Sequence, residues 1–256
     1  MTKFPILIPI CLFILGGCSI FSGNKEVKKL VADGLSPKEL YEQAQDKVNA
    51  GSIDQAIDQY EVILASYPGS KYAIQSRIDM AYNLFKRKKY NRSIIELDEF
   101  IQRYPALPTT PYAYYLRGIV AEEKSSSILD DIITDSAQRD VQSVRDAYSY
   151  FALLIENFPD SKYSKDAELK LSSLKNILAR HEFYVALYYT GIESHIAAIN
   201  RCKYIVENYP GSPTVADGLH LMAYNYDKIN TPKLAKDVRK VLLSSYPNYF
   251  PSYSID

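Results

Sequence analysis

Apolar residues recur along this chain at helical spacing, in stretches that end at an aromatic residue followed by proline. The pairs are Tyr67-Pro68, Tyr104-Pro105, Phe158-Pro159, Tyr209-Pro210 and Tyr246-Pro247. Because proline cannot continue a helix interior, each pair closes one helix and the next few residues start another. Successive prolines are 37, 54, 51 and 37 residues apart. These spacings indicate a repeat of about 34 residues, with a short extension in two units and a longer insertion in two.

Small residues recur at two fixed places before each proline. If the proline is position 32 of the unit, position 20 is Ala56, Ser93, Ala147, Ala198 and Ala235. Position 8 is Ala44, Ala81, Ala186 and Ala223, and Gly118 in the third unit once an insertion of 17 residues is allowed.

Larger residues follow at positions 24 and 27. Position 24 is Tyr60, Leu97, Phe151, Cys202 and Arg239, and position 27 is Ile63, Phe100, Leu154, Ile205 and Leu242. Small residues let the two helices of a hairpin approach closely, and large ones fill the space against the next unit. The sequence therefore predicts an all-α fold, a tetratricopeptide-type superhelical array of five helical hairpins. A helical bundle with similarly placed prolines is the alternative.

The third unit carries the more distinctive insertion. We assign residues 37–160 to units one to three and residues 161–250 to units four and five. The insertion covers about residues 122–145 and contains Ser125-Ser126-Ser127, Asp130-Asp131 and Asp135, so we expect one helix to extend and then a loop. Such a loop is either functional or a tolerated insertion.

The N-terminus has the parts of a secretory signal. Lys3 precedes an apolar run from Phe4 to Leu15, which is too short and too proline-rich for a membrane-spanning helix. Gly16-Gly17-Cys18 resembles the lipobox of bacterial lipoproteins, which implies a signal peptide at residues 1–17 and lipidation of Cys18. Polar residues 18–36 would form the lipidated tether. An ordinary signal peptide with a chance cysteine is the alternative.

The first helix of each unit in such an array lines the concave side. On the register above, groove-facing positions and the start of the third unit supply a set of aromatic residues: Tyr41, Tyr82, Phe85, Tyr112 and Tyr115. Tyrosine combines apolar area with a hydrogen-bonding tip and is enriched where proteins grip peptides. We therefore interpret this set as a peptide groove, with packing between repeats as the alternative role of each ring.

Composition and motifs argue against several classes of function. Thirty basic residues balance thirty acidic ones, and no dense basic cluster is present, which excludes a nucleic-acid partner. Cys202 is the one cysteine left after Cys11 and Cys18, so we expect neither an internal disulfide nor a reactive thiol. The three histidines lack metal-ligand spacing and no catalytic motif occurs, so we expect no enzyme, metal or cofactor. An enzyme that binds a cation at Asp130, Asp131 and Asp135 is the remaining alternative.

Several motifs in the second half are more specific. They are Gln138-Arg139-Asp140, Phe158-Pro159-Asp160-Ser161-Lys162-Tyr163, Tyr188-Tyr189 and Asn200-Arg201. With the lipobox and five units, they make the chain resemble the BamD (YfiO, ComL) family of outer-membrane-protein assembly factors. Val141 stands where that family usually has proline.

The resemblance implies a non-enzymatic scaffold in the Bam complex. It would bind a BamA-type barrel subunit and accessory Bam lipoproteins, and receive unfolded outer-membrane proteins through their C-terminal aromatic signal. The first units would take the substrate, and Asn200 and Arg201 would lie at the docking surface for the barrel subunit. Ser19 after the cysteine, rather than aspartate, favours a lipid anchor on the periplasmic face of the outer membrane. A tetratricopeptide lipoprotein for pilus assembly (a pilotin) or for cell-wall synthesis is the alternative.

Overall fold

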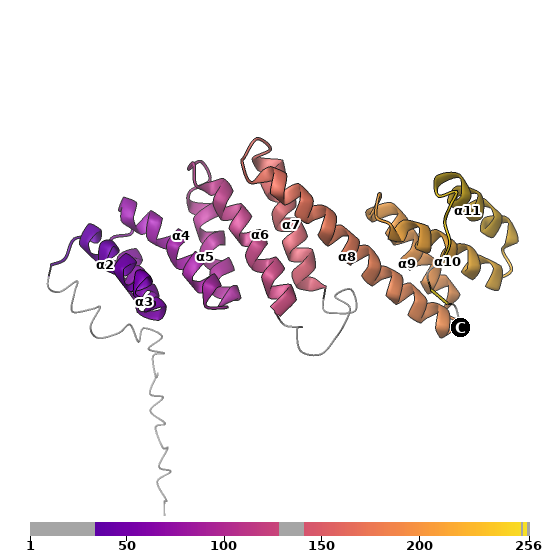
Figure 1. The fold of residues 1–256 in the computed structure, drawn as a ribbon, viewed down its shortest axis with the longest axis horizontal. Helices are drawn as coiled ribbons and strands as arrows, with labels where there is room; N and C mark the ends of the chain where they lie inside the picture. The colour runs from indigo at the N-terminus through magenta and orange to yellow at the C-terminus, as the bar shows by residue number, and fades with distance from the viewer. Residues whose placement is uncertain (1–33, 128–140, 252, 255–256) are drawn as a thin grey trace, which may run out of the picture.

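The structure is a computed structural model that describes residues 34–127, 141–251, 253 and 254. These residues form ten α-helices and no strand. The helices are α2 Pro37–Asn49, α3 Ile53–Ser66, α4 Lys71–Lys86, α5 Tyr90–Arg103, α6 Thr110–Ser127, α7 Gln142–Asn157, α8 Ser164–Gly191, α9 His195–Asn208, α10 Thr214–Lys228 and α11 Pro232–Ser245. They pair into five hairpins along one elongated array (Figure 1). The predicted all-α array of five hairpins is confirmed.

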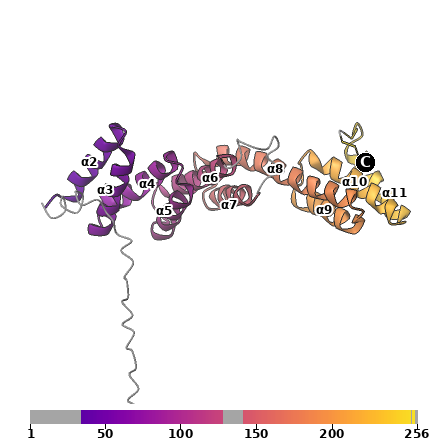
Figure 2. The same cartoon turned by 90° about the horizontal axis from the view of Figure 1, so that it is seen from below.

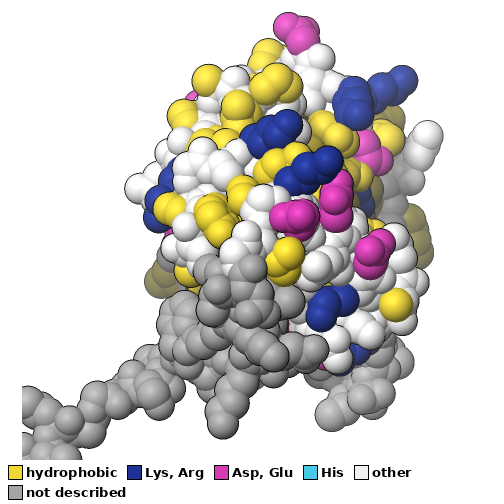
Figure 3. All heavy atoms as spheres, turned by 90° about the vertical axis from the view of Figure 1, so that its left-hand side faces the viewer, with side chains coloured by type: hydrophobic (Ala, Val, Ile, Leu, Met, Phe, Trp, Pro, Cys, Tyr) yellow, Lys and Arg dark blue, Asp and Glu magenta, His cyan; other side chains and the backbone are white. Residues whose placement is uncertain are grey.

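The array has two distinct sides. Seen from below, α2, α4, α6 and α8 lie along one side and α3, α5, α7 and α9 along the other (Figure 2). We call these the first-helix side and the second-helix side. On the N-terminal end face, basic and acidic side chains are interspersed among apolar ones (Figure 3). No helix of the described residues is long and apolar enough to cross a membrane.

Each aromatic–proline pair forms the same turn. The aromatic residue has an extended φ between −124° and −141°, and its N–H donates to the carbonyl four residues back at 2.8 to 3.0 Å. Its own carbonyl accepts from the N–H three residues on, as at Tyr67 and Ser70 at 3.0 Å. Proline pushes the residue before it out of the helical region, so the helix ends there. The repeat seen in the sequence is therefore a repeated backbone geometry.

The turn inside a hairpin is also repeated. Gly51, Lys88, Glu193 and Asn230 each lie 17 residues before the proline of their unit and adopt positive φ between 54° and 76°. At each site the following N–H donates to a carbonyl five residues back, the wider bond of a Schellman cap. Between α6 and α7, residues 128–140 lie outside the described part, so this turn is seen in the other four hairpins.

The predicted register describes the core. Residues at positions 8 and 20 are buried in all five units, as are those at position 27. Position 24 is buried in four units, and in the last unit Arg239 is exposed beside Asp227 because no described hairpin follows. The closest packing is in the third unit, where a Cβ on Gly118 would lie 2.4 Å from Cε1 of Phe151.

The two long proline spacings have different causes. In the third unit α6 continues to Ser127 and α7 begins at Gln142, and residues 128–140 between them lie outside the described part. The candidate cation ligands Asp130, Asp131 and Asp135 are among these residues, as are the family-like residues 138–140. In the fourth unit α8 is itself 28 residues long. Its first half packs against α7 and its second half against α9 and α10, so it joins the two ends of the array (Figure 1).

The first described helix, α2, begins at Pro37. Ser36 caps α2 with a reciprocal pair of hydrogen bonds to Glu39, which satisfies free N–H groups at the helix start. The signal peptide, Cys18 and residues 18–33 of the tether lie outside the described residues.

Candidate functional site

The predicted groove residues lie on the first-helix side. Tyr41 is on α2, Tyr82 and Phe85 are on α4, and Tyr112 and Tyr115 are on α6. We call these five residues, together with Tyr163 at the start of α8, the aromatic ladder. The structure groups them into three clusters rather than one continuous strip.

The first cluster surrounds Tyr41, which takes part in packing. Its hydroxyl donates to Asp79 Oδ2 at 2.5 Å, and its ring lies 5.7 Å from the Tyr72 ring. Gln45 Nε2 donates to Tyr60 Oη at 2.8 Å and to Asp79 Oδ2 at 3.0 Å. Burial, and then the bond to Asp79, raise the pKa of Tyr41. Tyr41 therefore links α2 to α4, and its hydroxyl is already used.

The second cluster is the most accessible part of the ladder. Tyr82 is 42% exposed, and its ring lies 6.4 Å from that of Phe85, which in turn contacts Tyr90. Burial raises the pKa of Tyr112 to about 12, and the electrostatic effect of the Tyr82 phenol raises it further. The two phenols therefore lie near each other, one on α6 and one on α4. An exposed aromatic pair beside a half-buried phenol provides apolar area with hydrogen-bonding tips.

The third cluster is built around Tyr163. Its ring stacks on Tyr115 at 5.1 Å with an interplanar angle of 22° and lies 5.6 Å from Tyr112. The hydroxyl of Tyr115 donates to Asp166 Oδ2 at 2.7 Å. Burial, followed by the bond to Asp166, raises the pKa of Tyr115. This cluster ties α6 to the start of α8.

Tyr163 and Tyr72 are ladder contacts that the groove prediction missed. Both end the same short motif after an aromatic–proline turn, Ser70-Lys71-Tyr72 and Ser161-Lys162-Tyr163. In each motif the lysine Nζ lies over its neighbouring ring, at 5.2 Å and 5.0 Å. The signal that could have identified them is this repeated Ser-Lys-Tyr.

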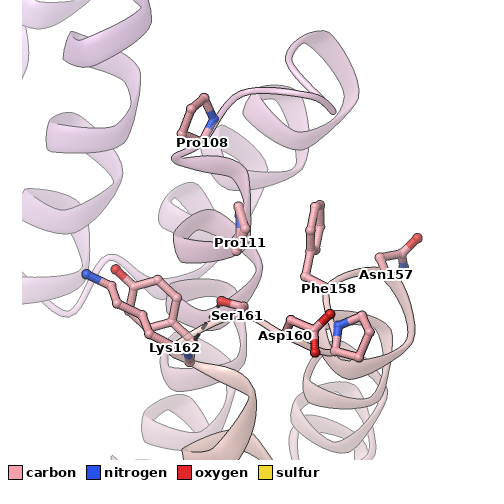
Figure 4. A pocket seen from close by; sticks show the side chains of 9 residues that line it. Pro108, Pro111, Asn157, Phe158, Asp160, Ser161 and Lys162 are labelled. Carbon is pink, nitrogen blue, oxygen red and sulfur yellow. Dashed lines mark hydrogen bonds between the residues drawn. The ribbon is translucent and has the colours of Figure 1, made fainter.

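A crevice of about 480 Å³ opens beside the third cluster. Pro108 and Pro111, before and at the start of α6, face Phe158 and Asp160 from the turn between α7 and α8 (Figure 4). Lys162 and Tyr163 also line it, so the crevice adjoins the ladder. Proline and aromatic rings give it a largely apolar wall, which suits a hydrophobic side chain of a bound segment.

The predicted docking residues lie at the other end of the array, on α9. Arg201 Nη1 forms an ion pair with Glu182 Oε2 at 2.9 Å, and Arg145 Nη2 pairs with Oε1 of the same carboxylate at 3.0 Å. Glu182 is only 2% exposed. One buried carboxylate on α8 thus joins α7 to α9, and we call this group the Glu182 clamp. Sequence reasoning did not identify Glu182 or Arg145.

The neighbouring surface carries several exposed large apolar side chains. Tyr189, Ala197, Asn200, Arg201 and Tyr204 line a depression of about 340 Å³. Four large side chains next to it along α8 and α9 are exposed: Tyr188, Ile192, Ile196 and Tyr204. We call the depression and these side chains the C-terminal patch. Contiguous exposed apolar area of this kind, around polar anchors, marks interaction surfaces in proteins.

The described residues offer little catalytic chemistry. Among them, no group of three or more His, Cys, Asp and Glu side chains is placed to hold a metal ion. Burial raises the pKa of the Cys202 thiol to about 12, so the buried thiol stays protonated at neutral pH. The ring of His195 is hydrogen-bonded to the side chain of Asn225, and the ring of His220 is hydrogen-bonded to the hydroxyl of Tyr253.

Comparison with known proteins assigns the family. The model of the YfiO family, described as outer membrane lipoprotein, matches residues 33–242. The outer membrane protein assembly factor BamD of Neisseria gonorrhoeae is 32% identical over 243 residues, which cover 94% of this chain and 91% of that protein. BamD of Haemophilus influenzae is 31% identical, covering 88% and 84%, and BamD of Xylella fastidiosa is 29% identical, covering 92% and 79%.

Solved structures with a similar arrangement of helices include MamA from Desulfovibrio magneticus, at 13% identity and a TM-score of 0.37, covering 84% of this chain and 97% of that one. A tetratricopeptide repeat protein from Parabacteroides merdae, at 12% identity, also gives 0.37, covering 83% and 67%. The family assignment depends on the sequence relatives and the family model. The chain belongs to the YfiO family of outer membrane lipoproteins.

Proposed function

We propose that this protein is a non-enzymatic scaffold lipoprotein of the machinery that assembles β-barrel proteins in the outer membrane. The observation that carries the proposal is the separation of two unlike surfaces within one array. The aromatic ladder lies on α2, α4, α6 and the start of α8, whereas the C-terminal patch lies on α8 and α9. A scaffold that presents an unfolded client to an insertion machine needs two such sites. The names of the similar proteins, outer membrane protein assembly factors, agree with this role.

The aromatic ladder is the proposed site for the C-terminal aromatic segment of unfolded outer-membrane proteins. Tyr82 and Phe85 would contact an incoming aromatic ring, because they are the accessible pair of the ladder. Tyr112 and Tyr115 form the next step, and the apolar crevice at Phe158 lies beyond them. Tyr41 supports the other end through Asp79.

The C-terminal patch is the proposed docking site for a BamA-type barrel subunit, with accessory Bam lipoproteins attached to the assembled complex. Asn200 lies on the exposed face of α9, and Arg201 keeps a half-exposed guanidinium while it pairs with Glu182. Lipidation at Cys18 would anchor the scaffold to the periplasmic face of the outer membrane, because several acyl chains at about 0.8 kcal/mol per buried CH₂ give stable attachment.

The ladder is tested with a synthetic peptide that copies the C-terminus of an outer-membrane protein and carries a photo-cross-linker. Replacing Tyr82 and Phe85 with alanine should lower the cross-linking yield about tenfold, since aromatic anchors carry much of the energy of peptide interfaces. Ile95→Ala removes an exposed side chain from α5 on the second-helix side and serves as the control. Equal yields from all three proteins would refute the ladder as the substrate site.

The patch is tested by purification of the tagged protein from the envelope in mild detergent. Ile196→Glu places a charge in the patch, and Leu169→Glu places one at a matched site on the first half of α8, since the two side chains are 67% and 69% exposed. We expect a barrel protein with periplasmic domains to co-purify with wild type and Leu169→Glu but not with Ile196→Glu. Recovery of pilus or wall-synthesis proteins instead would contradict the proposed function.

A further inference from the structure

One depression outside these two surfaces is acidic and lies on the second-helix side. It has a volume of about 640 Å³ and is bounded by α3 and α5, with α4 at its base. Asp58 and Glu61 on α3 face it, as do Glu96 and Glu99 on α5, and Arg77 and Arg92 lie between them. Four carboxylates and two guanidiniums leave a surplus of two negative charges. We call this depression the acidic crevice.

The two arginines are already paired. Arg77 Nη1 lies 2.5 Å from Glu96 Oε2 and 3.0 Å from Glu99 Oε2, and Arg92 forms an ion pair with Glu61. Asp58 forms no hydrogen bond or ion pair with the residues that the structure describes. Burial, followed by repulsion from Glu61 and Asp54, raises the pKa of Asp58. The crevice thus keeps a partly buried carboxylate and an unbalanced charge, both of which a cation would relieve.

The base of the crevice is apolar. Leu64 and Ala65 from α3 and the buried Met80 from α4 form it. A lysine side chain suits such a place, because its methylene stem packs on apolar surface while its ammonium reaches the carboxylates at the rim. The fitting occupant is a short segment that carries both lysines and aliphatic residues.

The chain itself contains such a segment shortly before its first described residue. Residues 25–31 read Lys-Glu-Val-Lys-Lys-Leu-Val, with three lysines against one glutamate. Their surplus of two positive charges matches the negative surplus of the crevice. The described chain starts close by, because Tyr67 Oη donates to the carbonyl of Leu35 at 2.9 Å, and Tyr67 lies only two residues beyond Ala65.

The segment is also long enough. Seven residues separate Leu35 from Lys28, which span up to about 25 Å when extended. Ala65 and Asp58 are seven residues apart on α3, a rise of about 10 Å. Lys28 and Lys29 therefore have enough chain to reach the α3 carboxylates of the crevice, Asp58 and Glu61, from the point where Tyr67 holds Leu35.

We infer that residues 25–31 dock in the acidic crevice, with Lys28 and Lys29 among the carboxylates of α3 and α5. Only seven residues then separate Lys25 from Cys18, a reach of at most about 25 Å. If Cys18 is lipidated, as the proposed function requires, the second-helix side of the first two hairpins is held near the membrane surface. The aromatic ladder on the opposite side is then left open to the periplasm.

The test is zero-length carbodiimide cross-linking of the full lipidated chain in mild detergent, with the linked residues identified by mass spectrometry. This reagent joins native lysines directly to native carboxylates, so no residue has to be replaced to see the contact. We expect Lys28 and Lys29 to be linked mainly to Asp58, Glu61, Glu96 or Glu99 of the same molecule. Mixing isotope-labelled and unlabelled protein separates links within one molecule from links between two.

Two comparisons make the result specific. Raising the salt concentration should lower these links about threefold, because the screening length falls from about 10 Å at 0.1 M to about 3 Å at 1 M. Asp58→Asn should lower them at low salt, whereas Glu42→Gln, an exposed site on α2 that is nearer in sequence, should not. The Asp58 variant removes no hydrogen bond or ion pair among the described residues, so its fold should be kept, which circular dichroism checks.

The inference is overturned if Lys28 and Lys29 link mainly to α2 carboxylates such as Glu42. It is also overturned if the crevice carboxylates link to lysines of a second copy or of a co-purifying protein, since another occupant would then fill the crevice. None of these outcomes depends on binding of a client or a barrel subunit. Failure here would therefore leave the proposed function standing, and failure of the binding tests would leave the docked tether standing.

Discussion

The contacts between first helices in the N-terminal half differ in chemistry from the contact that holds α9 in the C-terminal half. In the N-terminal half, tyrosine hydroxyls donate to carboxylates between first helices, as Tyr41 does to Asp79 and Tyr115 to Asp166. In the C-terminal half, the buried Glu182 is shared by Arg145 and Arg201. The tyrosines are neutral donors, and each of these hydrogen bonds contributes about 1 kcal/mol. A buried charge, by contrast, is costly to leave without its partners.

This difference suits the two proposed roles. A surface that accepts many client segments is better built from aromatic rings, which tolerate small shifts of the helices that carry them. A surface that docks one partner needs a fixed shape, and the Glu182 clamp fixes α9 against α7 and α8 right beside the C-terminal patch. In addition, the chain after α11 folds back on this half, since Tyr249 donates to Asp217 at 2.7 Å and Tyr253 packs on Phe183 at 4.8 Å.

The change with the largest expected effect is Arg201→Glu, which breaks the rigid half. It removes one partner of Glu182 and places a second carboxylate beside it. Breaking a buried ion pair costs about 3–5 kcal/mol, and we expect about 3 because Arg201 is 43% exposed. Hydrogen exchange followed by mass spectrometry should show faster exchange in α8, α9 and α10 while α2 to α5 are unchanged. Uniform acceleration would mean that the halves are not independent.

Arg201→Glu is for the same reason an ambiguous probe of docking. Loss of a partner in this variant would report either the patch or the clamp. Arg201→Lys keeps the charge near Glu182 but loses the fork geometry of the guanidinium. We expect it to be nearly as stable as wild type, so reduced docking of this variant would place Arg201 in the interface itself.

The second largest effect is expected within the third hairpin, from Gly118→Ala. The added Cβ would lie 2.4 Å from Cε1 of Phe151. The Phe151 ring is fully buried, so it is packed on all sides by other residues. Overpacking of this kind costs about 1–3 kcal/mol. Urea unfolding should show a lower midpoint. If the contact of α6 with α7 carries the coupling between hairpins along the array, the single transition should split in two.

Gly118 also shows how far the sequence could predict the fold. Its place at position 8 follows from the proline register, and with Phe151 at position 24 the close contact was implied. The aromatic–proline pairs gave the helix ends because proline acts locally, on the residue before it. The length of α8 was not predictable, because an apolar pattern that continues through an insertion has no local stop signal.

The site was less predictable than the fold. The ladder positions follow from the register, but which rings are accessible depends on their neighbours, and Tyr163 enters from a turn rather than from a first helix. The Glu182 clamp was missed because Arg145, Glu182 and Arg201 are far apart in sequence and lie on three helices. These three side chains come together only if α8 turns the face with Glu182 towards α7 and α9. The repeat register does not fix the orientation of that face, because α8 is longer than a helix of the repeat.

A smaller effect is expected from Tyr115→Phe in the ladder. The variant keeps the ring that stacks on Tyr163 and loses only the hydroxyl that donates to Asp166. The cost should be about 1 kcal/mol, measured by urea unfolding. Because the ring remains, cross-linking to the aromatic peptide should be unchanged. A large loss of peptide binding without a loss of stability would show that this hydroxyl contacts the client rather than α8.

The smallest change should stabilise the protein. Glu193 adopts a left-handed φ of 59° at the turn between α8 and α9, where the equivalent residue of the first hairpin is Gly51. A non-glycine residue in that conformation destabilises the fold by about 1–2 kcal/mol. Glycine removes this strain, but it also gives the unfolded chain more conformational freedom, which offsets part of the gain in stability. We therefore expect Glu193→Gly to raise the unfolding free energy by about 0.5 kcal/mol.

Lys88→Gly makes the same replacement in the second hairpin, at φ 57°. If the halves unfold independently, Glu193→Gly should slow hydrogen exchange only in α8 to α10 and Lys88→Gly only in α4 and α5, whereas equal effects from both would show that all five hairpins unfold as one unit.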